Sequence, residues 1–146
     1  MKTLIAFILK LIDRLAPATP VHAMTIAGDQ TLNGRAKLGV EAPTAAASLS
    51  ANENGTIHTN AGAVGEVVLT LPAAVAGLHF YFGVREAQAL TIEPATGETI
   101  SLPSTGVPES ANDFISANAV GETVHLMCVE DGSWACMGFT GTWAGE

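Results

Sequence analysis

The chain has 146 residues, enough for one domain with a sizeable buried core. Its hydrophobic share of 48% rests heavily on alanine and only 5% of the residues are aromatic, which favours a thin β-sandwich or barrel over a large aromatic core. The net charge of −8 argues against a nucleic acid partner, because an acidic surface repels phosphates.

The charge is unevenly distributed along the chain. Residues 1–37 contain five basic and two acidic residues, a net +3, whereas residues 38–146 contain one basic residue, Arg85, and twelve acidic ones, a net −11. A weakly basic N-terminal segment therefore precedes an acidic body. An acidic surface of this kind keeps a protein soluble.

Residues 1–23, MKTLIAFILKLIDRLAPATPVHA, are predicted to form an amphipathic helical docking arm. Apolar side chains recur with helical period, while Lys10, Asp13 and Arg14 fall toward the opposite side. Pro17 and Pro20 end the helix. Such a helix is marginal alone in water, so we expect it to bury its apolar stripe in a partner. The stripe consists of Leu4, Ile5, Ile8, Leu11, Ile12 and Leu15.

The same segment allows two other interpretations. Lys2, the apolar run after it and the "VHA" before Met24 are typical of a cleaved secretory signal, but Lys10 and Asp13 interrupt the run. The segment is shorter than the roughly 20 apolar residues of a membrane span. Its three basic residues make a thin polar face for a membrane-surface helix, so a membrane partner is not expected.

Residues 24–54 are predicted to be an extended linker with short strands, and the body starts at residue 55. The linker is rich in Ala, Gly, Thr and Asn, with turn signals at Asn33-Gly34 and Asn54-Gly55. Short strands are expected around Thr25–Ile26 and Ala36–Val40.

Residues 55–146 show a β pattern throughout, which predicts a single antiparallel β-sandwich of jelly-roll-like type. Short apolar runs such as "EVVLTL", "LHFYFGV" and "ETVHLMCV" are separated by Gly, Pro, Asn or Asp. Phe80 and Phe82 are expected to face one way, with His79 and Tyr81 facing the other.

The stretch "DGSWACMGFTGTW" at residues 131–143 is predicted to be the closing hairpin of this fold. A two-residue turn at Asp131-Gly132 pairs Cys128 with Ala135 and Cys136 with Met127, placing the two thiols on opposite sides. A three-residue loop would bring the cysteines face to face. The two-residue turn predicts free, buried thiols, consistent with a reducing compartment.

Three aromatic residues of this hairpin are predicted to be anchors, in the core or at an interface: Trp134, Phe139 and Trp143. Gly138 and Gly141 mark a bend or bulge between them.

No catalytic, cofactor or metal set is predicted. His125, Cys128 and Cys136 would be a partial zinc set, but strand alternation scatters them. His58 and His79 lie on predicted strands, where polar-face or interface roles are expected. No Gly-x-Ser-x-Gly elbow marks a nucleophile, and no two carboxylates stand out as a pair. Because the chain has many carboxylates, a small hydrolase with a carboxylate pair remains a rival interpretation.

The body also carries longer motifs: "TIHTNAGAVGEVVLTLP", "GLHFYFGV", "ALTIEPATGETI", "SANAVGETVHLMCVEDGSW" and a closing "GFTGTW". With these motifs, the run from Ser50 to Trp143 resembles a β-domain that recurs in structural proteins of tailed bacteriophages. The resemblance implies a non-enzymatic virion protein: a capsid decoration (cement) protein, or else a head-fibre or tail-fibre domain. It brings no catalytic residues.

Together, resemblance and arm predict a capsid decoration protein that docks on the major capsid protein or another virion protein and stabilises the particle. It would be a homo-oligomer, with a trimer favoured, and would lie on the virion surface after assembly in the bacterial host cytoplasm. The rival from another class is a secreted carbohydrate-binding β-module, which would stack sugars on Trp134, Trp143 or Tyr81 and lose residues 1–23 as a signal.

Overall fold

The structure is a computed structural model that describes residues 38–145. The predicted helical arm, including Leu4, Ile8 and Leu15, and the strand expected around Thr25–Ile26 lie outside these residues.

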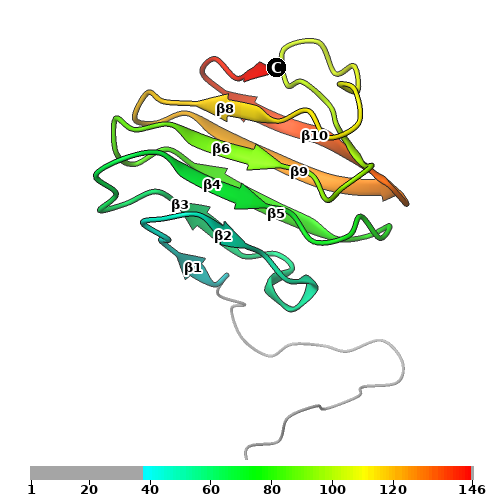
Figure 1. The fold of residues 1–146 in the computed structure, drawn as a ribbon, viewed down its shortest axis with the longest axis horizontal. Helices are drawn as coiled ribbons and strands as arrows, with labels where there is room; N and C mark the ends of the chain where they lie inside the picture. The colour runs from blue at the N-terminus through cyan, green and yellow to red at the C-terminus, as the bar shows by residue number, and fades with distance from the viewer. Residues whose placement is uncertain (1–37, 146) are drawn as a thin grey trace, which may run out of the picture. The chain divides into compact units, whose positions relative to one another are not determined.

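Residues 38–145 fold into two β-sheets stacked as layers (Figure 1). The six-stranded sheet contains, in spatial order, β1 (Val40–Glu41), β3 (Ile57–Thr59), β5 (His79–Gly83), β9 (Thr123–Glu130), β10 (Ser133–Thr140) and β7 (Thr99–Ile100). The five-stranded sheet contains β11 (Ala144–Gly145), β8 (Ile115–Ala117), β6 (Leu90–Glu93), β4 (Val67–Thr70) and β2 (Ala47–Ser48). One 3-10 helix, η1 (Ala51–Glu53), connects β2 to β3. The protein is therefore all-β and sandwich-like, as predicted.

The prediction of a purely antiparallel sandwich is wrong, because both sheets are mixed. Strands β1, β3 and β5 pair in parallel in one sheet, and β2, β4 and β6 do so in the other. From β1 to β9, each connection carries the chain from one sheet to the other. Alternate strands from β1 to β6 run in the same direction, and each of these parallel crossovers passes through a strand of the opposite layer, whereas β8 and β9 run antiparallel to β6 and β5. Among the strands of residues 38–145, the chain returns directly as a hairpin only between β9 and β10.

The core fills the space between the two sheets, and the predicted alternation supplies it. Phe80 and Phe82 of β5 are buried, whereas His79 and Tyr81 are half-buried on the other face. On β4, Val67 and Leu69 are likewise buried. The side chains of Phe80 and Trp134 meet at a centroid distance of 5.7 Å, which joins β5 to β10.

The β9–β10 hairpin has the predicted two-residue turn, with Glu130 opposite Ser133. A bulge between Ser133 and Trp134 then shifts the register, so Cys128 lies opposite Trp134 and Cys136 opposite Leu126. The expectation that the two thiols lie on opposite sides is therefore wrong.

Both cysteines instead pack against the core, and both are free. Burial raises the pKa of the Cys128 and Cys136 thiols, which disfavours the reactive thiolate. A second register shift between Cys136 and Gly138 confirms the predicted bulge in this hairpin.

The carboxylate of Glu122 organises the end of the hairpin. It accepts hydrogen bonds from the backbone N–H groups of Thr142 (2.6 Å), Ala119 (2.8 Å) and Asn118 (3.1 Å). These bonds, with Thr142 the largest contributor, lower the pKa of the Glu122 carboxyl. Gly141 turns beside it with φ of 80°, and a Cβ there would overlap the Glu122 side chain.

Replacing Glu122 by glutamine should lower the free energy of unfolding by about 2 kcal/mol at pH 7, because charge-assisted hydrogen bonds are lost. The folded-state pKa lies below the unfolded value near 4.3, so this contribution is present above that pH and disappears as the pH falls through the folded value. Urea unfolding of both proteins at several pH values should show the difference shrinking below about pH 4. The exposed Glu130→Gln variant is the control, and a difference independent of pH would contradict the assignment.

Within residues 38–145, no helix has the length and apolar character needed to cross a membrane.

Candidate interaction surface

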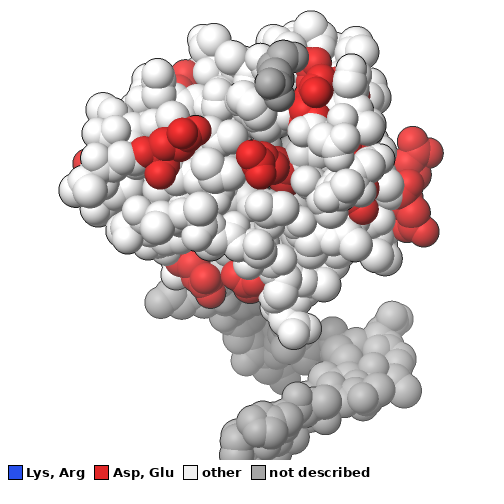
Figure 2. Space-filling view, viewed as in Figure 1, with Lys and Arg blue, Asp and Glu red and all other residues white. Residues whose placement is uncertain are grey.

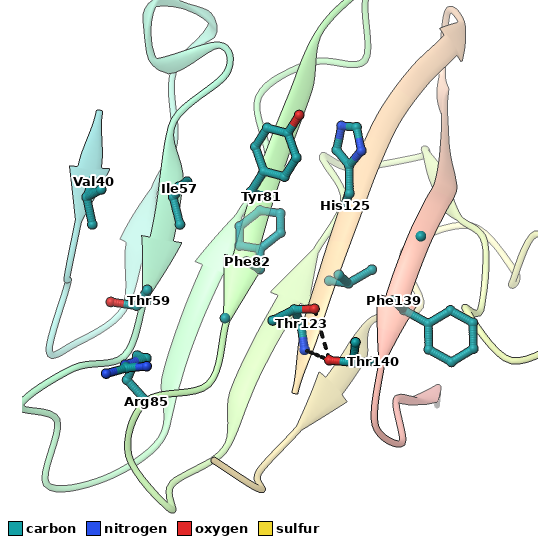
Figure 3. Close-up of a pocket in the computed structure, with 13 residues that line it drawn as sticks. Val40, Ile57, Thr59, Tyr81, Phe82, Arg85, Thr123, His125, Phe139 and Thr140 are labelled. Atoms are coloured by element: carbon teal, nitrogen blue, oxygen red, sulfur yellow. Dashed lines mark hydrogen bonds between the residues drawn. The ribbon is translucent and has the colours of Figure 1, made fainter. Parts of the chain in front are cut away.

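An apolar groove of about 630 Å³ opens on the outer face of the six-stranded sheet (Figure 3). Its lining comes from β1, β3, β5, β9 and β10, so it runs across most of the sheet. The apolar side chains that shape it include Val40, Ile57, Tyr81 and Phe139. Val40 and Phe139 are 63% and 44% exposed, which leaves large apolar surface in contact with water.

Strand register explains how these residues meet. Side chains alternate between the two faces of a strand, and the core takes Phe80, Phe82, Val124 and Leu126. Their neighbours along β5 and β9 must therefore point outward. Directly paired residues on adjacent strands share a face, and the pairs Val40–Ile57, Ile57–Tyr81 and Tyr81–His125 carry the lining across four strands.

An aromatic cluster lies at one side of the groove. The rings of Tyr81 and His125 stack at a centroid distance of 4.1 Å and an interplanar angle of 17°. His79 meets His125 edge-on, with His125 Nε2 3.4 Å from His79 Nδ1. Burial lowers the pKa of the His125 imidazole, and the charge of His79 lowers it further. The neutral form of His125 is thereby favoured.

The polar groups of the groove lie at its other end (Figure 3). Arg85 is the only lysine or arginine in residues 38–145. The hydroxyls of Thr123 and Thr140 lie 3.0 Å apart, and the Thr140 hydroxyl also donates to the Gly121 carbonyl. These hydroxyls are thus engaged with the protein itself. The groove is suited to apolar surface rather than to a ligand that needs many hydrogen bonds.

No acidic side chain lines the groove, although residues 38–146 contain twelve. Elsewhere the surface is acidic: in the view of Figure 2 the coloured side chains are all carboxylates. The groove is therefore a patch where another acidic molecule could approach without close repulsion.

The three predicted anchors of the closing hairpin have different environments. Trp134 is fully buried and Trp143 is 2% exposed, so both lie in the core. The indole Nε1 of Trp143 donates to the carbonyls of Thr123 (3.1 Å) and Thr140 (3.3 Å). Phe139 lies at the side of the groove, and the stripe residues of the predicted arm lie outside the described part.

Burial also limits the sugar-stacking interpretation. Trp134 and Trp143 cannot stack on a ligand, since both are covered by protein. Tyr81 stays half-buried on the groove, but His125 is stacked on its ring.

Within residues 38–145, the structure places some of the candidate residues considered from the sequence apart from one another. His125 faces the groove while Cys128 is buried in the core, so alternation separates them as expected. Among the carboxylates, Glu98 accepts a hydrogen bond from the Ala74 N–H (2.7 Å) and Asp113 accepts one from the Ser110 N–H (3.1 Å). Both side chains therefore brace loops.

The sequence analysis missed the groove because it treated the outward residues separately. The alternation correctly placed His79 and Tyr81 away from the core. The parallel pairing of β1, β3 and β5, which aligns Val40, Ile57 and Tyr81, has no local sequence signal.

The sequence matches no protein-family model and no curated protein. The fold and the surface define the class: a sandwich-like all-β protein with an apolar groove on one sheet.

Proposed function

We propose that this chain is a non-enzymatic structural protein of a virion, namely a capsid decoration protein. The observation that carries the proposal is the apolar groove on the six-stranded sheet. A contiguous exposed apolar surface on a folded domain marks a place where another macromolecule packs. The resemblance of residues 50–143 to a β-domain of tailed-phage structural proteins supplies the setting.

The groove is proposed to receive a second copy of the chain, which makes the protein a homo-oligomer, with a trimer favoured. Two features support a copy as the occupant. The lining has no carboxylate, so acidic bodies can meet there at low electrostatic cost. The groove also reaches Val40 of β1, which is the edge strand of its sheet within residues 38–145. A neighbouring copy can therefore contact both the groove and the edge of this strand.

Residues 1–23 are proposed to dock the protein on the capsid. Their apolar residues recur with helical period, and the first 37 residues carry a net +3 against −11 for the rest. The two parts of the chain would then have different roles: the N-terminal segment binds the particle, and the β-bodies of neighbouring copies bind each other. A protein that binds only the assembled shell stabilises that shell by mass action.

The test compares binding to particles of the tailed phage that encodes the chain. Replacing Leu4, Ile8, Leu11 and Leu15 by serine should abolish co-sedimentation with particles while circular dichroism still reports a folded β-body. The matched control replaces Thr3, Ala6, Lys10 and Asp13 by serine. It changes the same number of residues, leaves the net charge of the chain unchanged, and should leave binding intact.

Full occupancy of the particle by the apolar-stripe variant would contradict the docking role. Mass spectrometry of the mature chain separates the rival: a protein that begins near residue 24 would favour a secreted module. A gene found outside any phage genome would contradict the virion setting.

A further inference from the structure

A buried histidine and two carboxylates converge at one edge of the sandwich, and His58 faces the core side of the sheet that carries the groove on its outer face. His58 of β3 and Glu41 of β1 are direct register partners, and Glu53 is the last residue of η1. One ligand atom from each of the three side chains lies within 4.8 Å of the others. Three segments that are separate in sequence therefore place an imidazole nitrogen and two carboxylate oxygens around one point.

His58 is unusual because its ring is fully buried and neither ring nitrogen has a hydrogen-bond partner. One side of the ring is occupied by the core, since Phe80 and Phe82 lie at centroid distances of 6.0 and 5.8 Å. A buried polar group without a partner costs free energy. The nearest candidates to offset that cost are the two carboxylates, and their ligand atoms do not hydrogen-bond to the ring.

The two carboxylates also raise the free energy of the folded state, and a bound cation would offset this cost as well as that of the unpaired His58 nitrogens. Glu41 and Glu53 bring two negative charges close together, which is unfavourable without a counter-charge. Glu53 is held in place, because its Oε2 accepts hydrogen bonds from the Ser50 N–H (2.6 Å) and hydroxyl (2.8 Å).

We infer that Glu41, Glu53 and His58 form a binding site for a divalent first-row transition metal such as Zn²⁺. One imidazole nitrogen with two carboxylate oxygens is a donor set that suits this class, with water completing the coordination on the exposed side of Glu41. Two ligands of one tetrahedral zinc ion lie about 3.4 Å apart, because each bond is about 2.0–2.2 Å. Binding would therefore require side-chain rotations that bring ligand atoms now within 4.8 Å of one another closer together.

The ion would fasten the edge of the fold. Strand β1 has two residues and, among residues 38–145, pairs with β3 alone, and η1 is a single turn between the two sheets. A metal bound to all three segments would fix both β1 and η1 to β3. This inference stands independently of the proposed function.

The test titrates zinc chloride into the full chain, freed of metal by a chelator, and follows binding by calorimetry. Glu41→Gln together with Glu53→Gln keeps side-chain size and leaves an acceptor for Ser50, so the fold should survive. We expect zinc to bind the wild type and this double variant to bind at least about 100-fold more weakly, since even loss of an outer-shell partner costs 10–100-fold. The matched control, Glu93→Gln with Glu130→Gln, removes the same charge elsewhere and should bind like the wild type.

A second readout identifies the nitrogen ligand. Zinc should shift the ring ¹⁵N resonances of His58, whereas those of His79 and His125, whose rings pair on the opposite face, should stay in place. Equal zinc affinity in the wild type and the Glu41/Glu53 variant, or zinc shifts confined to His79 and His125, would overturn the inference. Undetectable zinc binding by the wild type would overturn it as well.

Discussion

Replacing Trp134 by alanine should lower the free energy of unfolding by about 3–5 kcal/mol, the usual cost of truncating a large buried aromatic residue. Trp134 is fully buried on β10, opposite Cys128 of β9 and Ile100 of β7, and its ring meets Phe80 of β5 at 5.7 Å. The cavity left by alanine would therefore loosen four strands of the six-stranded sheet. Guanidinium unfolding followed by far-ultraviolet circular dichroism measures the loss.

Phenylalanine variants of the two tryptophans separate packing from hydrogen bonding. The indole Nε1 of Trp134 has no hydrogen-bond partner, whereas that of Trp143 donates to the carbonyls of Thr123 and Thr140. Trp143→Phe should thus cost about 1 kcal/mol more than Trp134→Phe, the typical net contribution of a hydrogen bond. A Trp134→Ala variant as stable as the wild type would contradict the placement of this ring at the centre of the core.

The strands were predictable from the sequence because their signal is local. Alternation along β4 and β5 assigned the buried and outward residues correctly, including Val67, Phe80 and Tyr81. The order and direction of the strands were not predictable in this way. A turn between two apolar runs looks the same whether the chain folds back in one sheet or crosses to the other, so antiparallel pairing was expected where parallel crossovers occur.

Bulges account for the error in the closing hairpin. Its turn at Asp131-Gly132 has a local signal and was predicted correctly. The register shift one residue later depends on how Trp134 fits into the core, which pairing rules do not contain. Cys128 faces the core by alternation with Leu126 on β9, and the register shift puts Cys136 opposite Leu126, on the same side.

The candidate surfaces likewise combine a local feature, which the sequence indicates, with strand pairing, which it does not. Sequence indicated that Tyr81 faces outward, but the groove needs β1, β3, β5, β9 and β10 side by side. The Glu41–Glu53–His58 cluster likewise depends on parallel pairing of β1 with β3 and on the path of η1. Sites assembled from several strands can be read only once the topology is known.

Replacing Asn60 by alanine should lower the free energy of unfolding by about 2–4 kcal/mol, because it removes four part-buried hydrogen bonds to the backbone. Asn60 is fully buried directly after β3. Its Oδ1 accepts from the N–H groups of Arg85 (2.7 Å) and Glu86 (3.0 Å), and its Nδ2 donates to the carbonyls of Glu86 (3.2 Å) and Gln88 (3.0 Å). Every hydrogen-bonding position of this amide is therefore used.

This amide holds the crossover from β5 to β6, and with it the backbone of Arg85 at the polar end of the groove. Asn60→Asp is the matched variant: it keeps the size and the acceptor for two N–H groups, but turns a negative oxygen toward two carbonyls. We expect it to destabilise at neutral pH and to recover part of the loss in acid, where a protonated carboxyl can donate. Hydrogen exchange should show the Arg85 and Glu86 amides losing protection in Asn60→Ala before the β9 amides do. Uniform protection in that variant would mean that the crossover is held by other contacts.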